Sequence, residues 1–122
     1  MIERWAIVGS RRWAPRAWVR EIVDQIPWMG RLVTGDCPTG VDNLALELTA
    51  RHRLDVQRIS FHADWGQYGR LAGPMRNTLV AGECDVLFAF WDGKVKHSGT
   101  LDVVRKAIGL GKPVAIIWER KP

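Results

Sequence analysis

Short apolar runs alternate with longer amphipathic segments along the whole chain. The apolar runs predict strands over residues 5–8, 31–34, 55–60, 85–91 and 114–118. In most segments between them apolar residues recur at helical spacing, and we predict helices over residues 15–25, 41–52, 73–82 and 99–110. This alternation is typical of an α/β fold. We expect a Rossmann-like three-layer sandwich with a mainly parallel five-stranded sheet.

Local signals indicate where the predicted helices end and which faces they bury. Pro15 suits a first helical turn, and Pro27 ends the first helix. Residues 61–72 are polar and contain glycine, so we expect a long connection there. The run 85–91 is apolar throughout, as expected for a central strand covered on both faces. Helical spacing links Trp18, Ile22 and Ile26 in the first helix, Val41, Leu44, Ala45 and Leu48 on one face of the second, and Leu101, Val104 and Ile108, expected to face inward, in the fourth.

Polar, glycine-bearing segments follow the first four predicted strands. In an open parallel sheet ligands bind outside the carboxyl ends of the strands, so these segments predict a site at one sheet edge. Several lead into helices, whose N-terminal N–H groups favour an anion, and glycine lets the backbone approach a phosphate closely. The same residue types also cap helices and form turns. The residues predicted to bind a ligand are Gly9, Ser10, Arg11, Thr34, Gly35, Asp36, Gly40, Asp42, Asp64, Trp65, Arg76, Asn77, Ser98, Gly99 and Thr100.

Three features of this edge have more than one interpretation. Asp42, near a predicted helix start, either caps the helix, braces the loop or accepts from a ribose hydroxyl, and a structural role is favoured. The stretch 63–77 combines the rings of Trp65 and Tyr68 with polar donors, which suits either an adenine base or a packed loop. Cys37 lies near a helix N-terminus, where a thiol acidifies. No partner histidine follows from the spacing, so a nucleophilic cysteine is not expected.

The composition fits one globular domain with a basic net charge. The chain has 122 residues, 47% hydrophobic and 25% charged, and we expect a single domain over residues 1–122. No apolar run reaches the roughly 20 residues of a membrane span, and no secretory signal is recognised, so we expect a cytoplasmic protein. Cys37 and Cys84 make no disulfide framework or zinc spacing, and no metal or cofactor is identified. The net charge of +5 favours anionic partners, although the basic residues are spread along the chain.

Ordered motifs over nearly the whole chain resemble those of one superfamily. They are Gly9-Ser10-Arg11, residues 33–42, Ala63-Asp64-Trp65, residues 72–77, Asp85, Phe90-Trp91-Asp92-Gly93 and Ser98-Gly99-Thr100. Together they resemble the YspA-like branch of the SLOG superfamily, which joins the DNA-processing Smf proteins and the Lonely Guy enzymes. The resemblance implies a Rossmann-like sheet and a nucleotide-derived ligand.

The resemblance also bears on catalysis. Lonely Guy enzymes release a base from a nucleoside 5′-monophosphate, using a Pro-Gly-Gly-x-Gly-Thr-x-x-Glu motif and an upstream arginine. Gly99-Thr100 is similar to the Gly-Thr pair, and Arg76 is most like the upstream arginine. The glutamate position falls on Val103, and the Pro-Gly-Gly run is absent, so we do not expect the same chemistry from the same residues. The candidates for a catalytic role are Arg76, Asp36, Asp64 and Asp92.

Three functions are compatible with these observations. The first is binding of a nucleotide-derived, phosphate-bearing small molecule at the carboxyl edge of the sheet, as a sensor or processing domain. The second is hydrolysis of an N-glycosidic or phosphate bond of a nucleotide. The third is single-stranded nucleic-acid binding, in which the basic charge and the ring of Trp65 or Tyr68 would supply attraction and stacking. The third ranks last because the basic residues form no concentrated stripe. Relatives in the superfamily often dimerise, which leaves a homo-oligomer open.

Overall fold

The computed structural model describes residues 2–119 and contains a five-stranded, all-parallel sheet in the order β3-β2-β1-β4-β5. The strands are β1 (Arg4–Gly9), β2 (Arg31–Gly35), β3 (Gln57–Phe61), β4 (Val86–Trp91) and β5 (Val114–Trp118). The helices are α1 (Arg16–Gln25), α2 (Val41–His52), α3 (Trp65–Tyr68), α4 (Ala72–Glu83) and α5 (Gly99–Gly109), with a 3₁₀ turn η1 (Gly69–Leu71). None of the helices in residues 2–119 has the length and apolar content of a membrane span. The predicted α/β fold is confirmed.

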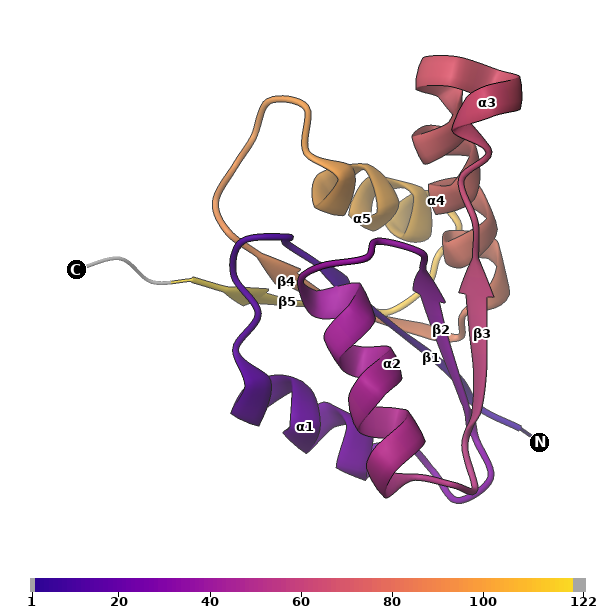
Figure 1. Ribbon diagram of the computed structural model, residues 1–122, viewed down its shortest axis with the longest axis vertical. Helices are drawn as coiled ribbons and strands as arrows, with labels where there is room; N and C mark the ends of the chain where they lie inside the picture. The colour runs from indigo at the N-terminus through magenta and orange to yellow at the C-terminus, as the bar shows by residue number, and fades with distance from the viewer. Residues whose placement is uncertain (1, 120–122) are drawn as a thin grey trace.

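The sheet is the middle of three layers (Figure 1). Helices α1 and α2 cover one face, where Ile7, Leu32 and Phe90 are buried with the apolar residues of both helices. Helices α4 and α5 cover the other face over Ala6 and Leu87. Successive side chains of a strand point to opposite faces, so adjacent residues of β1 enter different cores. Both faces are therefore closed, and polar residues concentrate at the ends of the strands.

Two helices bury faces that differ from the predicted spacing. In α5 the buried residues are Val103, Val104 and Ala107, whereas Ile108 is 59% exposed. The expectation that Ile108 faces inward is therefore wrong, because the face that packs on the sheet lies one residue earlier and accepts the small side chain of Ala107. In α1 the buried residues are Val19 and Val23, followed by Ile26, and Trp18 is exposed. The predicted face of α2, with Val41, Leu44, Ala45 and Leu48, is confirmed.

The segment around β3 differs from its prediction in two places. β3 begins at Gln57, two residues after the predicted start, because Asp55 is engaged in a loop: its carboxylate accepts from Arg53 Nη2 and from the Met29 N–H, both at 2.8 Å. The expected connection over residues 61–72 contains α3 and η1. Asp64 caps α3 by accepting from the Gln67 N–H at 3.0 Å. A short helix of this kind lacks the long apolar periodicity that sequence patterns detect.

The strand order creates a switch point between β1 and β4. The chain moves from β1 to β2 and β3 on one side, then crosses back to β4 on the other side of β1. The loops that leave β1 and β4 therefore turn toward opposite faces of the sheet, and a crevice forms outside their carboxyl ends. The register pairs Gly9 with Phe90, the last residue of β1 with the penultimate residue of β4. Because of this register, the loops after β1 and β4 begin side by side at the carboxyl edge of the sheet.

Candidate functional site

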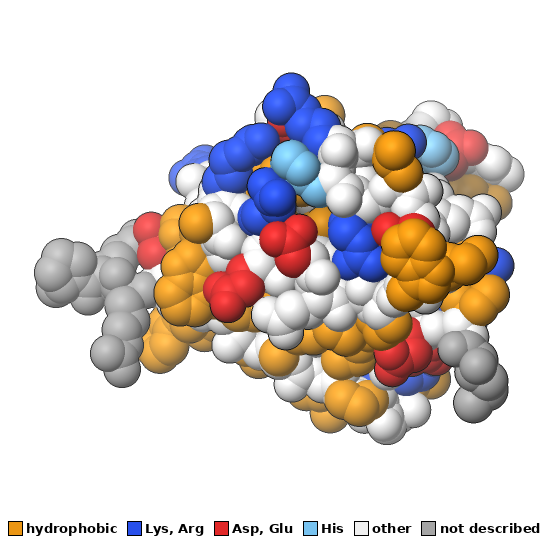
Figure 2. Space-filling model, turned by 90° about the horizontal axis from the view of Figure 1, so that it is seen from below, with side chains coloured by type: hydrophobic (Ala, Val, Ile, Leu, Met, Phe, Trp, Pro, Cys, Tyr) orange, Lys and Arg blue, Asp and Glu red, His pale blue; other side chains and the backbone are white. Residues whose placement is uncertain are grey.

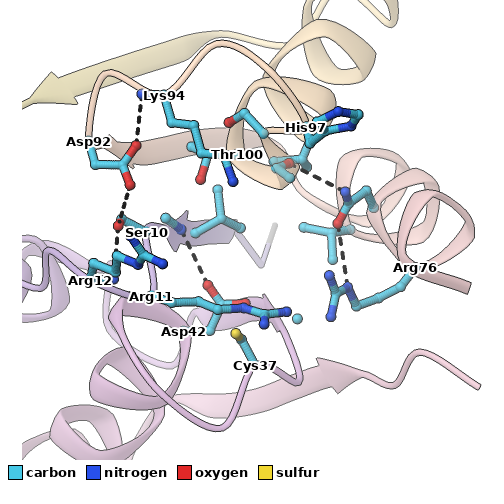
Figure 3. Close-up of a pocket in the computed structure, with 18 of the residues that line it drawn as sticks. Ser10, Arg11, Arg12, Cys37, Asp42, Arg76, Asp92, Lys94, His97 and Thr100 are labelled. Carbon is cyan, nitrogen blue, oxygen red and sulfur yellow. Dashed lines mark hydrogen bonds between the residues drawn. The ribbon is translucent and has the colours of Figure 1, made fainter. Parts of the chain in front are cut away.

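A pocket of about 870 Å³ opens at the switch point, and segments from β1, β2, α2, α4, β4 and α5 form its walls (Figure 3). Its volume lies within the range of small-molecule sites. The lining residues are Val8, Gly9, Ser10, Arg11, Arg12, Gly35, Cys37, Asp42, Arg76, Asn77, Val80, Asp92, Gly93, Lys94, His97, Ser98, Gly99, Thr100, Val103 and Glu119. This pocket therefore opens at the predicted edge of the sheet.

Ser10 joins the loop after β1 to the loop after β4. Its hydroxyl donates to Asp92 Oδ2 at 2.9 Å and accepts from the N–H groups of Arg12 and Trp13 at 3.0 and 3.1 Å. Its own N–H donates to the carbonyl oxygen of Phe90 at 3.0 Å. With one donor and two acceptor sites, the hydroxyl is fully used. Ser10 therefore holds the loops after β1 and β4 together at the pocket.

Asp92 braces the second of these loops. Besides the contact with Ser10, its Oδ1 accepts from the Lys94 N–H at 2.9 Å. The hydrogen bond from the Lys94 backbone, followed in importance by that from Ser10, holds the pKa of Asp92 below its usual value despite partial burial. Asp92 is thus a charged group whose two oxygens shape the loop.

The start of α2 is pressed against the loop after β1 at Gly40. Gly40 has a φ of +81°, and a Cβ there would stand 2.2 Å from the carbonyl oxygen of Ser10. The same carbonyl accepts from the Val41 N–H at 3.1 Å. Only glycine fits this conformation and this approach without strain. The contact fixes the start of α2 beside Ser10.

Asp42, in the first turn of α2, is a buried carboxylate in the pocket wall. The residue is 6% exposed, and Oδ1 accepts from the Gly9 N–H at 3.3 Å. The helix N-cap is Gly40, and no side chain caps it. Burial raises the pKa of Asp42 to about 6, although Arg76, the Gly9 N–H and the Thr34 hydroxyl favour the charged form. Asp42 therefore titrates near neutral pH inside the pocket.

Arg76, on α4, is held at the pocket by Asp36. Its Nη1 donates to Asp36 Oδ1 at 2.6 Å, and its Nε donates to Asn77 Oδ1 at 3.4 Å. The other oxygen of Asp36 accepts from the Ala63 N–H at 3.0 Å and lies 3.4 Å from Nδ1 of His62. Burial opposes ionisation of Asp36, but the hydrogen bonds from Arg76 and Ala63 outweigh it and lower the pKa. Asp36 thus positions Arg76 from outside the pocket.

The N-terminus of α5 forms the wall opposite Asp42. Ser98 is the N-cap, and its hydroxyl accepts from the Leu101 N–H at 3.1 Å. Asn77 ties this end to α4 by donating through Nδ2 to Asp102 Oδ2 at 3.0 Å and to the Gly99 carbonyl oxygen at 3.4 Å. The first N–H groups of a helix have no acceptor within the helix. Those of Gly99 and Thr100 lie at the pocket and suit an anion.

Side chains of both charges line the pocket. Four lining residues are Arg or Lys, and three are Asp or Glu. In Figure 3, Asp92, Lys94, Thr100 and His97 lie on one side of the space, and Asp42, Cys37 and Arg11 lie on the other, so each side carries charges of both signs. Figure 2 shows one face of the molecule, where several Lys and Arg side chains gather in the upper part of the view, while apolar and uncharged groups with scattered acidic side chains cover most of the rest. On that face the cations form a cluster and no stripe.

Most of the predicted ligand-binding residues meet at this pocket. Those that line it are Gly9, Ser10, Arg11, Gly35, Asp42, Arg76, Asn77, Ser98, Gly99 and Thr100. Thr34 is fully buried beneath it, and Asp36 and Gly40 support it from outside. Asp64 caps α3, and Trp65 lies against Gly73, with a ring atom 3.1 Å from the place of a Cβ. A ligand contact of Asp64 or Trp65 stays a prediction.

Sequence reasoning did not select Arg12, Lys94 and His97, which also line the pocket. Arg12 directly follows the predicted Gly9-Ser10-Arg11 segment, and the other two lie in the polar loop between Asp92 and Ser98. Their only signal was membership of segments that follow strands. That signal identifies loops but does not show which side chains turn inward.

The carboxylates suggested for catalysis have other contacts. Asp36 holds Arg76, Asp64 caps α3, and Asp92 braces its loop. Val103, at the position of the Lonely Guy glutamate, lines the pocket and is 2% exposed, so this part of the wall is apolar. Within residues 2–119, no three His, Cys, Asp or Glu side chains gather as metal ligands.

A scan against protein-family models and searches of curated proteins and solved structures found no match to this chain. The structure bears out the coarser implication of the resemblance, a Rossmann-like parallel sheet.

Proposed function

We propose that this protein binds a nucleotide-derived, phosphate-bearing small molecule in the pocket at the switch point, as a member of the SLOG superfamily similar to its YspA-like branch. The observation that carries the proposal is the combination, around one concavity, of the α5 N-terminus with Arg11, Arg12 and Lys94. Helix N–H groups and guanidinium groups are the donors that proteins use most for phosphate.

The size and lining of the pocket support a ligand larger than phosphate. A volume of about 870 Å³ exceeds the space of one phosphate group and suits a nucleoside phosphate. Val8, Val80 and Val103 supply apolar surface beside the polar groups. Apolar surface with a few placed donors and acceptors is the usual lining for a base or a sugar.

Binding is tested with a panel of nucleotides and a matched pair of variants. Isothermal titration calorimetry would measure affinity for ribonucleoside 5′-monophosphates, diphosphates and cyclic nucleotides. Arg11→Gln removes a pocket cation, and Arg105→Gln removes an exposed cation of α5 that does not line the pocket. We expect Arg11→Gln to weaken the best ligand by about tenfold, since a charge-assisted hydrogen bond contributes about 1.5–3 kcal/mol. Arg105→Gln should change it less than twofold. Absence of binding to every nucleotide would overturn the proposal.

Hydrolysis of a nucleotide is a second candidate function, and Asp42 is the observation that favours it. A carboxylate whose pKa is raised to about 6 can exchange a proton near neutral pH, as acid–base catalysis requires. Native mass spectrometry of the same panel distinguishes the two functions, because a binder retains the intact mass and a hydrolase releases base or phosphate. Loss of product formation in Asp42→Asn, with binding retained, would support hydrolysis.

A further inference from the structure

Asp42 has fewer partners than a buried carboxylate requires. The residue is 6% exposed, and its Oδ1 accepts from the Gly9 N–H at 3.3 Å. The Thr34 hydroxyl is the other hydrogen-bond donor that favours its charged form. An ionised carboxylate offers about four acceptor sites. Burying it with few donors is unfavourable. An asparagine oxygen would serve the Gly9 N–H equally well, so this contact alone does not account for a carboxylate.

An ion pair within the protein does not explain the buried carboxylate of Asp42 either. Arg76 is the cation whose charge acts most strongly on Asp42, yet its Nη1 donates to Asp36 at 2.6 Å. Within residues 2–119, no cationic nitrogen lies within 4.0 Å of an Asp42 oxygen. Gly35 leaves the carboxylate room, since a Cβ there would stand 2.8 Å from Asp42 Oδ2. Because Asp42 lines the pocket, we infer that its remaining acceptor capacity is available to a ligand there.

Asp42 and the start of α5 lie on opposite sides of the pocket, with Arg11 on the side of Asp42 and Asp92 on the side of Lys94 (Figure 3). A phosphate next to Asp42 would be repelled by the carboxylate, and repulsion between anions is strong where water is excluded. On the opposite side, Gly99 and Thr100 begin α5 near Lys94 (Figure 3). A ligand that is anionic at one end and carries neutral hydrogen-bond donors at the other end matches both sides.

We propose that Asp42 is a recognition residue that accepts hydrogen bonds from neutral donors of the bound nucleotide, either sugar hydroxyls or a base amino group, while the phosphate lies at the start of α5. This inference rests on the proposed function and adds the orientation of the ligand. It also predicts discrimination: a ligand without these donors leaves the buried carboxylate unsatisfied, and sites built to bond a donor reject analogues that lack it.

The test measures ligand discrimination rather than affinity alone. The probes are the ribonucleoside 5′-monophosphates, their 2′,3′-dideoxy analogues, and purine riboside 5′-monophosphate, which is adenosine 5′-monophosphate without the amino group. Dissociation constants are measured for wild type, Asp42→Ala and Asp42→Asn, with Asp24→Asn on the exposed surface of α1 as the control for loss of a carboxylate. Asp42→Asn is the variant that keeps the shape of the buried side chain, in case the alanine variant folds poorly.

We expect wild type to prefer the donor-bearing nucleotide over its donor-free analogue by at least about tenfold. The preference should fall to about threefold or less in Asp42→Ala, and binding of inorganic phosphate should not weaken, because a nearby negative charge is removed. If Asp42→Ala loses the preference for the ribonucleotide over its dideoxy analogue, Asp42 accepts from sugar hydroxyls. If it loses the preference for adenosine 5′-monophosphate over purine riboside 5′-monophosphate, Asp42 accepts from the amino group. Equal binding of all analogues by wild type, or a preference that persists in both Asp42 variants, overturns this inference and leaves the proposed function standing. Absence of any nucleotide binding overturns both.

Discussion

The guanidinium of Arg76 is bonded at 2.6 Å to Asp36, a residue that does not itself line the pocket. Asp36 follows β2, and Arg76 lies 40 positions later, in the first turns of α4. Through the Ala63 N–H, the same carboxylate also holds the chain after β3. One acidic side chain therefore sets the position of a pocket cation and of a neighbouring loop.

Replacing Arg76 by alanine should loosen this arrangement. The variant leaves the partly buried Asp36 without its main cation, and we expect a loss of about 1–3 kcal/mol in the free energy of unfolding. Removal of the positive charge should also raise the pKa of Asp42, which Arg76 lowers. Urea unfolding measures the first effect, and titration of the Asp42 carboxyl by NMR measures the second. An unchanged Asp42 titration would contradict the influence of the Arg76 charge on this carboxyl group.

Ser10→Ala should separate the loops after β1 and β4. The variant removes the donor to Asp92 and the acceptor for the Arg12 and Trp13 N–H groups, and we expect a loss of about 1–2 kcal/mol in unfolding free energy. Hydrogen exchange should become faster at the Arg12 and Trp13 amides. Ser60→Ala serves as a comparison because Ser60 donates only to the Gly35 carbonyl oxygen, at 3.1 Å. Equal losses of stability in the two variants would argue against a role of Ser10 in holding the two loops together.

Asp42→Asn should stabilise the protein at neutral pH and not in acid. The pKa of Asp42 in the folded chain is about 6, above its ordinary value of 3.8. As the pH falls through 6, the folded chain takes up a proton that the unfolded chain takes up only near 4, so the penalty for burying the charge disappears. The variant should gain up to about 3 kcal/mol near pH 8 and little near pH 4. Unfolding of both proteins across this range checks the sign, and a gain that grows on acidification would refute it.

Gly40→Ala should be strongly destabilising. The φ of +81° and the 2.2 Å approach to the Ser10 carbonyl oxygen leave no place for a methyl group, so the start of α2 must move. We expect a loss of more than about 2 kcal/mol. Gly109→Ala is the matched control, because nothing lies within 4 Å of its added Cβ at the end of α5. That variant should be neutral or gain up to about 1 kcal/mol. Thermal unfolding of the two proteins measures the difference.

Thiol labelling should report on occupancy of the pocket. Cys37 lines the pocket and is 9% exposed, whereas Cys84 is fully buried and burial raises its pKa. A small alkylating reagent should therefore modify Cys37 first, and a bound nucleotide should slow that reaction at least about fivefold. Cys37→Ser identifies the labelled residue by mass spectrometry. Labelling of Cys37 at an unchanged rate with saturating nucleotide would place the ligand elsewhere.

The sheet was predictable because its strands are short apolar runs between helices with clear periodicity. β4 reads as apolar along its whole length since helices cover both faces of the sheet. Strand order and the exposed position of Ile108 depend on how whole elements pack, and the spacing within one helix does not contain that information. The helix at Trp65–Tyr68 was missed because four residues carry too little periodicity.

The candidate site was predictable as a set of loops and less so as a set of side-chain roles. Strand ends in a parallel sheet meet at one edge, which is why Gly9, Gly35 and Thr100 come together. Whether a carboxylate supports a loop or faces a ligand depends on which donors reach it in three dimensions. Asp92 and Asp42 lie in similar polar contexts in the sequence and both line the pocket, and only the fold shows that loop donors hold both oxygens of Asp92.

The register between Gly9 and Phe90 has a consequence for the range of molecules that fit. A methyl group on Gly9 would stand 2.5 Å from the Phe90 carbonyl oxygen, so the main chains of the two central strands touch where they leave the sheet. At this point the width of the pocket is set by the backbone, which side-chain rotation cannot change. Arg11, Arg12 and Lys94, by contrast, line the pocket with long, exposed side chains. We therefore expect the pocket to exclude ligands that are too thick to fit between the two strand ends and to accept ligands of different lengths.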